Sequence, residues 1–97
     1  MARAPLTKEA IDAALAELPG WRFEADQLRR EYKFGGFKEA LSFIVRIGMH
    51  AEEQNHHPEI WNVYSTVRLA LNTHDAGNKV TEADVKLART IQEVAWV

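Results

Sequence analysis

The stretch "EEQNHHPEIWNVY", residues 52–64, decides the fold because the hydrophobic pattern changes there from helical to extended. Before it, apolar residues recur every three or four positions, which predicts a helix over about 37–54. Pro58 cannot continue a helix and disfavours helical geometry at the residue before it. The adjacent His56 and His57 are therefore held at the junction of two elements, and their role there is the question that the sequence raises.

Two strands are predicted after this junction, at residues 60–64 and 67–73. Apolar and polar residues alternate over much of the second, as they do in a strand with one buried face. A short turn near Ser65-Thr66 would join the strands as an antiparallel pair, so the start of one lies opposite the end of the other. That pairing brings His74, just after the second strand, close to the two adjacent histidines.

The rest of the chain supplies a hairpin and two more helices. Thr7 is expected to cap a first helix, and residues 21–34 alternate as a hairpin. Thr81 is expected to cap the last helix, with Asp84 in its first turn, where a carboxylate favours the helix dipole. The order α-β-β-α-β-β-α predicts an α+β fold, a four-stranded antiparallel sheet with three helices packed on one face.

The composition is that of one globular domain over residues 1–97, with 46% hydrophobic and 27% charged residues. A net charge of −2 without a basic stripe argues against nucleic-acid binding. The absence of cysteine excludes disulfides and thiolate chemistry. No apolar run has the length of a membrane helix or a signal peptide, so we expect a cytoplasmic protein that does not bind a membrane.

The helix predicted over 37–54 has more apolar surface than one sheet can bury. One stripe of it is formed by Phe37, Ala40, Leu41, Ile44, Ile47 and Ala51. Phe43, Val45 and Met49 lie off this stripe and would be exposed in a monomer. We therefore expect a homo-oligomer that uses this helix, an edge of the sheet, or both.

Three readings of the histidine cluster are compatible with the residues. Histidine exchanges protons near neutral pH, so the cluster could supply the acid and the base that expulsion of water requires. Three histidines could instead bind zinc, although adjacent side chains diverge and the spacing is not that of a helical zinc motif. A non-catalytic cluster is the third reading. His50, inside the helix, is read as an ordinary, partly exposed residue.

Two neighbours of the cluster are candidates for supporting roles. Glu52 could orient an imidazole, or be a solvated carboxylate at a helix end. Trp61 could stack on a flat heterocycle, or pack on the face of the sheet.

The spacing of these residues resembles that of the pterin-4a-carbinolamine dehydratases. Glu52 is followed after three residues by His56-His57-Pro58, then after five by Tyr64, after nine by His74, and further on by Asp84. The predicted element order is also similar to the α+β fold of that family, and the likeness covers nearly the whole chain.

The resemblance implies a hydro-lyase. It would remove water from 4a-hydroxytetrahydrobiopterin to give quinonoid dihydropterin, with no metal and no organic cofactor, and so recycle the pterin of aromatic amino acid hydroxylases. By the same resemblance, His56, His57 and His74 form the acid–base set. The implied substrate-binding residues are Asn55, His56, His57, Asn72, Thr73, His74 and Asp75.

The resemblance also implies partners. Family members are dimers or tetramers, and functional coupling to an aromatic amino acid hydroxylase is expected. Some animal members also act as dimerisation cofactors for a homeodomain transcription factor. The alternative is therefore a catalytically weak member that serves as a protein-binding or dimerisation module, although an intact histidine set favours the enzyme.

Overall fold

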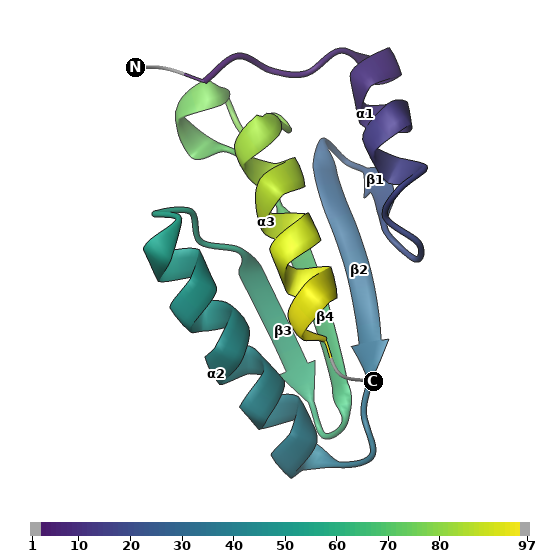
Figure 1. Cartoon of the computed structure of the whole chain (residues 1–97), viewed down its shortest axis with the longest axis vertical. Coiled ribbons are helices and arrows are strands. Elements are labelled where there is room, and N and C mark those ends of the chain that lie inside the picture. Colours follow the sequence, from purple (N-terminus) through teal and green to yellow (C-terminus); the bar gives the residue numbers. More distant parts are fainter. Residues whose placement is uncertain (1–2, 96–97) are drawn as a thin grey trace.

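The structure, a computed structural model, describes residues 3–95 and has the element order predicted from the sequence (Figure 1). The elements are α1 (Lys8–Leu15), β1 (Arg22–Glu24), β2 (Gln27–Lys33), α2 (Phe37–Glu53), β3 (Glu59–Val63), β4 (Thr66–Leu71), the short 3₁₀ helix η1 (His74–Ala76) and α3 (Glu82–Val94). The predicted α+β class is confirmed. Only η1, between β4 and α3, adds an element that was not predicted to the described part of the chain.

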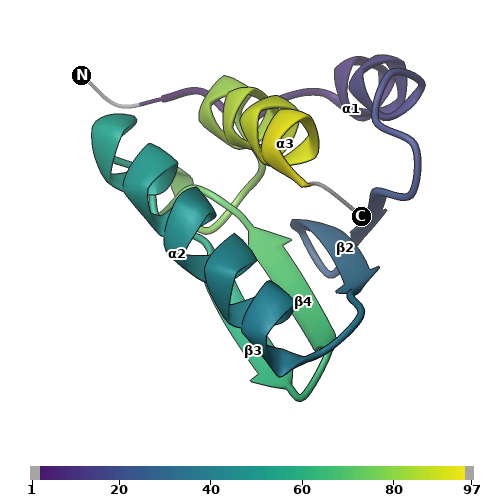
Figure 2. The same cartoon turned by 60° about the horizontal axis from the view of Figure 1, so that its bottom comes forward.

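The four strands form one antiparallel sheet in the order β1-β2-β4-β3. Leu28 of β2 lies opposite Leu71 of β4, and Ile60 of β3 lies opposite Leu69 of β4. The three helices pack on one face of the sheet (Figure 2), and the other face is left open. The strands β1 and β3 are the two edges.

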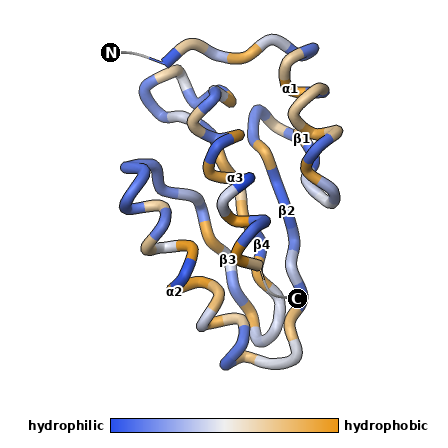
Figure 3. Tube along the Cα trace, viewed as in Figure 1, coloured by the Kyte–Doolittle hydropathy of each residue, from blue (hydrophilic) through white to orange (hydrophobic). Residues whose placement is uncertain are grey.

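The core lies between the helices and the inner strands. Leu69 and Val67 of β4 are buried against Phe43 and Ile47 of α2 and Ile91 of α3. Figure 3 shows hydrophobic residues along these helices and strands. Burial of each such side chain contributes roughly 1.5–3 kcal/mol, so this contact between α2 and the sheet is a main source of stability.

The predicted caps of both outer helices are present. The Thr7 hydroxyl accepts a hydrogen bond from the amide of Ala10 at 3.1 Å. Thr81 and Asp84 form a capping box at the start of α3, in which the Thr81 amide donates to the Asp84 carboxylate at 2.8 Å.

The exposed face of α2 differs from the one predicted. Phe43 is fully buried, so its assignment to an exposed second face is wrong. Phe37 and Leu41, assigned to the buried stripe, are exposed instead together with Val45 and Met49. The reason is geometric: the apolar arc of α2 is wider than the arc that contacts the sheet, and periodicity alone does not show which part turns inward.

No helix within residues 3–95 is both long enough and apolar enough to span a membrane.

Candidate active site

Two connections meet at one end of the sheet, the one between α2 and β3 and the one after β4 (Figure 1). Together with Arg3 they line a pocket of about 400 Å³. Its lining residues are Arg3, Asn55, His56, His57, Asn72, Thr73, His74 and Asp75. The antiparallel pairing of β3 with β4 thus brings together the three histidines, as the sequence predicted, along with every residue expected to bind substrate.

The end of α2 presents the adjacent histidines through a Schellman motif. Asn55 has a left-handed backbone with φ of 50°. Its amide donates to the carbonyl of Glu52, and the amide of His56 donates to the carbonyl of Ala51, both at 3.0 Å. Asparagine is one of the few residues that tolerate this conformation. Asn55 therefore ends the helix and turns the chain towards the pocket, a role that the sequence interpretation did not include.

His56 is the buried member of the cluster, and its Nε2 is hydrogen-bonded to a carboxylate oxygen of Asp84. Asp84 is fully buried, and its other oxygen accepts from the Thr73 hydroxyl and the Thr81 amide, each at 2.8 Å. Asp84 was predicted only as a first-turn acid of α3, which is incomplete. Its buried charge is compensated by three donors, one of which is His56.

The donor directions in this network follow from the number of protons available. The Thr73 hydroxyl donates to Asp84, so the 2.6 Å contact between Thr73 and Thr81 uses the proton of Thr81. An ionised Asp84 only accepts, so Nε2 of His56 carries a proton and Nδ1 is the nitrogen left for exchange. The network thereby selects one tautomer of His56.

The other two histidines are exposed, and each has a partner at one ring nitrogen. Nε2 of His57 lies 2.8 Å from a carboxylate oxygen of Glu52, the contact expected of an orienting group. Nδ1 of His74 lies 3.1 Å from the amide oxygen of Asn78, and that oxygen can only accept. Asn78, which sequence reasoning missed, therefore leaves Nε2 of His74 free.

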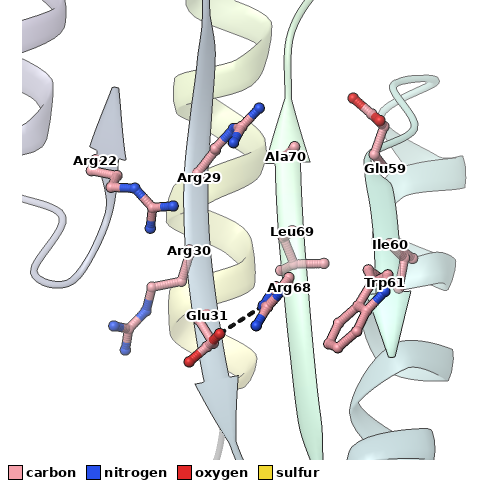
Figure 4. Close-up of a pocket in the computed structure, with 10 residues that line it drawn as sticks. All are labelled: Arg22, Arg29, Arg30, Glu31, Glu59, Ile60, Trp61, Arg68, Leu69 and Ala70. Carbon is pink, nitrogen blue, oxygen red and sulfur yellow. Dashed lines mark hydrogen bonds and ion pairs between the residues drawn. The ribbon is translucent and has the colours of Figure 1, made fainter. Parts of the chain in front are cut away.

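His50 and Trp61 lie away from the pocket. Nδ1 of His50 lies 3.2 Å from a carboxylate oxygen of Glu53 on α2, as expected of an ordinary helix residue. Trp61 does not line the histidine pocket. Of its two readings, packing on the face of the sheet is the one that the structure shows, and contact with a bound heterocycle stays a prediction. Trp61 lies on the open face of the sheet, where the Arg68 guanidinium stacks 4.3 Å from its ring centre (Figure 4).

The hollow beside Trp61 is larger than the histidine pocket, about 540 Å³, and its charged lining residues are four arginines and two glutamates, Arg22, Arg29, Arg30, Arg68, Glu31 and Glu59. Arg68 donates to Glu31 at 2.8 Å, and this hydrogen bond holds the pKa of Glu31 below its usual value. Arg29 bonds to the side chains of Gln27 and Glu24. The three histidines, which exchange protons near neutral pH, are all at the other site, so acid–base chemistry favours the histidine pocket over the larger hollow.

A metal centre was one of the three readings of the cluster. Within residues 3–95, no group of three or more His, Cys, Asp or Glu side chains is arranged to hold a metal ion.

Comparison with solved structures gives the class of protein. The chain superposes on the crystal structure of a transcriptional coactivator/pterin dehydratase from Brucella melitensis with a TM-score of 0.89 and 36% identity, covering 94% of this chain and 98% of that one. A pterin dehydratase-like protein, described as a RuBisCO assembly factor of the alpha-carboxysome, shares the fold with a TM-score of 0.67 and 22% identity, over 79% of this chain and 90% of that one. The fold is that of a pterin dehydratase-like domain.

Sequence comparison gives the family. Residues 4–94 match the family model described as pterin 4 alpha carbinolamine dehydratase. Proteins from Opitutus terrae and Mesorhizobium japonicum, both named "Putative pterin-4-alpha-carbinolamine dehydratase", are 52% and 47% identical, over 95% and 92% of this chain and the same shares of their own. The chain belongs to the pterin 4 alpha carbinolamine dehydratase family.

Proposed function

We propose that this protein removes water from 4a-hydroxytetrahydrobiopterin to give quinonoid dihydropterin. One observation carries the proposal. Three histidines border a single pocket, and each has one ring nitrogen held by a carboxylate or amide oxygen. This arrangement leaves the second nitrogen of each ring free to give or take a proton.

The reaction needs one acid and one base. The bond between C4a and oxygen breaks, the oxygen takes a proton and leaves as water, and the neighbouring ring nitrogen loses a proton. The exposed His57 and His74 suit these two transfers, because a bound pterin can reach them from solvent. His56 completes the set from the buried side, with its tautomer chosen by Asp84.

The remaining lining residues are proposed to hold the pterin. Asn55, Asn72 and Asp75 present amide and carboxylate groups that match the donors and acceptors of a pterin edge. Thr73 is nearly fully buried, and its hydroxyl is used by Asp84, so it supports the pocket wall from behind. Glu52 orients His57. One histidine gives the proton that the leaving oxygen takes and another accepts the proton that the ring nitrogen loses, so the proposed reaction uses no metal or organic cofactor.

We propose a cytoplasmic protein that recycles the pterin oxidised by an aromatic amino acid hydroxylase. We also propose a homodimer or homotetramer, because the exposed apolar side chains of α2 lie beside the unpaired edge strand β3, which exposes Ile60 and Val63.

A second candidate is a weakly active member that serves as a binding or assembly module. It is favoured by the names of the two structural relatives, one a coactivator as well as a dehydratase and the other an assembly factor. The intact and partnered histidine set favours the enzyme, since a scaffold has no need of it.

Stopped-flow measurement of water loss from freshly generated 4a-hydroxytetrahydrobiopterin separates the two candidates. Dehydration also proceeds in buffer, so the rate with micromolar protein is compared with the rate without it. A rate that rises in proportion to protein concentration supports the enzyme. A rate equal to that in buffer contradicts the enzyme and supports the binding module.

A further inference from the structure

The segment before α1 reaches the histidine pocket. The amide of Leu6 donates to the carbonyl of Val80 at 2.9 Å, and the side chain of Leu6 packs against the core. Arg3, three residues before this anchor, lines the pocket, where it is the one lining residue that comes from neither connection of the sheet.

Arg3 also lines a second hollow of about 510 Å³. The two hollows share two lining residues, Arg3 and His56. His57, His74 and Asp75 line the first hollow and not the second. Arg3 therefore lies where the histidine pocket continues into further space, away from the exposed acid–base groups.

The charge of Arg3 is available to a ligand. Within residues 3–95 no carboxylate forms an ion pair with it. The other two charged residues of the second hollow, Glu82 and Lys86, are exposed and have opposite signs. One guanidinium donates two parallel hydrogen bonds to a carboxylate and neutralises its single charge. A phosphate monoester, with nearly two charges, would be left partly uncompensated.

The reaction indicates which part of the substrate meets Arg3. Departure of the protonated hydroxyl group as water leaves positive charge on the pterin ring until the ring nitrogen loses its proton, and a guanidinium beside the ring would oppose this charge. The ring's N–H edge is better matched by the carboxylate of Asp75 in the first hollow. The substituent at C6 of the pterin is the part that can extend to Arg3 and into the second hollow.

We propose that Arg3 is a specificity-determining residue that selects pterins whose C6 substituent ends in a carboxylate. This inference rests on the proposed function for the identity of the ring. It adds that the C6 substituent lies along the second hollow and that its terminal carboxylate binds Arg3, in the segment before α1.

Direct binding tests the proposal without turnover. Fluorescence titration compares pterin-6-carboxylate with 6-hydroxymethylpterin, two stable ligands that differ in the charge of one small group. The parent protein should bind the carboxylate about tenfold more tightly, the scale of one charge-assisted hydrogen bond. Arg3→Gln should reduce this preference to within about twofold, and Arg3→Lys should retain part of it. Arg89→Gln is the matched control, because Arg89 is an exposed arginine of α3 that lines neither hollow.

Three results would overturn the inference alone: no preference in the parent, an unchanged preference in Arg3→Gln, or an equal loss in Arg89→Gln. Failure of both ligands to bind the parent would overturn it together with the pterin site. A preference that depends on Arg3 in a protein without dehydratase activity would support the inference and contradict only the proposed reaction.

Discussion

Asp84 carries the most interactions of any single side chain at the site, since His56, Thr73 and Thr81 all donate to it. In Asp84→Asn the amide oxygen can still accept from the two threonines, but the amide nitrogen must then donate to His56. His56 would have to release the proton on Nε2 and carry it on Nδ1, which is the wrong tautomer for exchange.

We predict that Asp84→Asn folds, loses about 1–3 kcal/mol of stability, and dehydrates roughly 10²-fold more slowly. Nitrogen NMR of the histidine rings should show the proton of His56 moved from Nε2 to Nδ1. Asp12→Asn, at an exposed carboxylate paired with Lys8, is the control and should change neither quantity. Parent-like activity in Asp84→Asn with an unchanged tautomer would contradict this role.

Residue-level prediction succeeded where the spacing along the chain was local. The three histidines were placed together because one hairpin relates them. The pairing of His56 with Asp84 spans 28 positions and depends on how α3 packs, which no local pattern encodes. Trp61 shows the same limit, since alternation assigns it to a face of β3 without saying which face carries the pocket.

At the scale of elements, Asn55 controls the exit from α2. Its left-handed backbone places His56 and His57 at the pocket, so the position requires a residue that tolerates a φ of 50°. Glycine meets this requirement and a β-branched residue does not.

We predict that Asn55→Gly keeps the free energy of unfolding within about 1 kcal/mol of the parent, whereas Asn55→Val lowers it by about 1–2 kcal/mol or more. Urea denaturation measures both. The control is Glu53→Val, which places the same side chain in ordinary helical geometry and should cost only a few tenths of a kcal/mol in propensity. Equal costs for valine at 53 and 55 would show that the left-handed turn is not required.

Element boundaries were predictable because strong local signals mark them. Pro58 separates α2 from β3, and Thr81 with Asp84 marks the start of α3. The Schellman motif escaped prediction because asparagine is a weaker signal than glycine for a left-handed helix end.

At the scale of the whole molecule, α2 has an exposed line of apolar side chains, Phe37, Leu41, Val45 and Met49. We expect a second copy of the chain to bury them. A charge placed on this line would be buried without a partner in an assembly but would be solvated in a monomer. The buried Phe43, by contrast, belongs to the core, so a charge there would unfold the chain.

We predict that Leu41→Glu and Met49→Glu dissociate or rearrange the proposed homo-oligomer at micromolar concentration, as measured by analytical ultracentrifugation. Phe23→Glu makes the same change on the opposite edge strand β1 and should leave the assembly intact. A parent protein that sediments as a monomer near 11.0 kDa would show that this face stays in water.

The overall architecture followed from the order of elements, because few folds accommodate this alternation of helices and strands around one small sheet. The order of elements did not predict which face of α2 turns towards the sheet. Which apolar side chains turn towards the sheet depends on the angle at which α2 crosses it, and that angle is set by packing against β4 and α3.

The central claim is that the histidines act as one acid–base unit. It is tested most directly by the dehydration rates of His57→Ala, His74→Ala and the double variant against buffer. Each single change should lower the rate of the catalysed reaction by roughly 10²-fold or more, and the double variant should lose less than the product of the two, since groups that act together are not additive. Rates within about twofold of the parent in both folded single variants would contradict the claim.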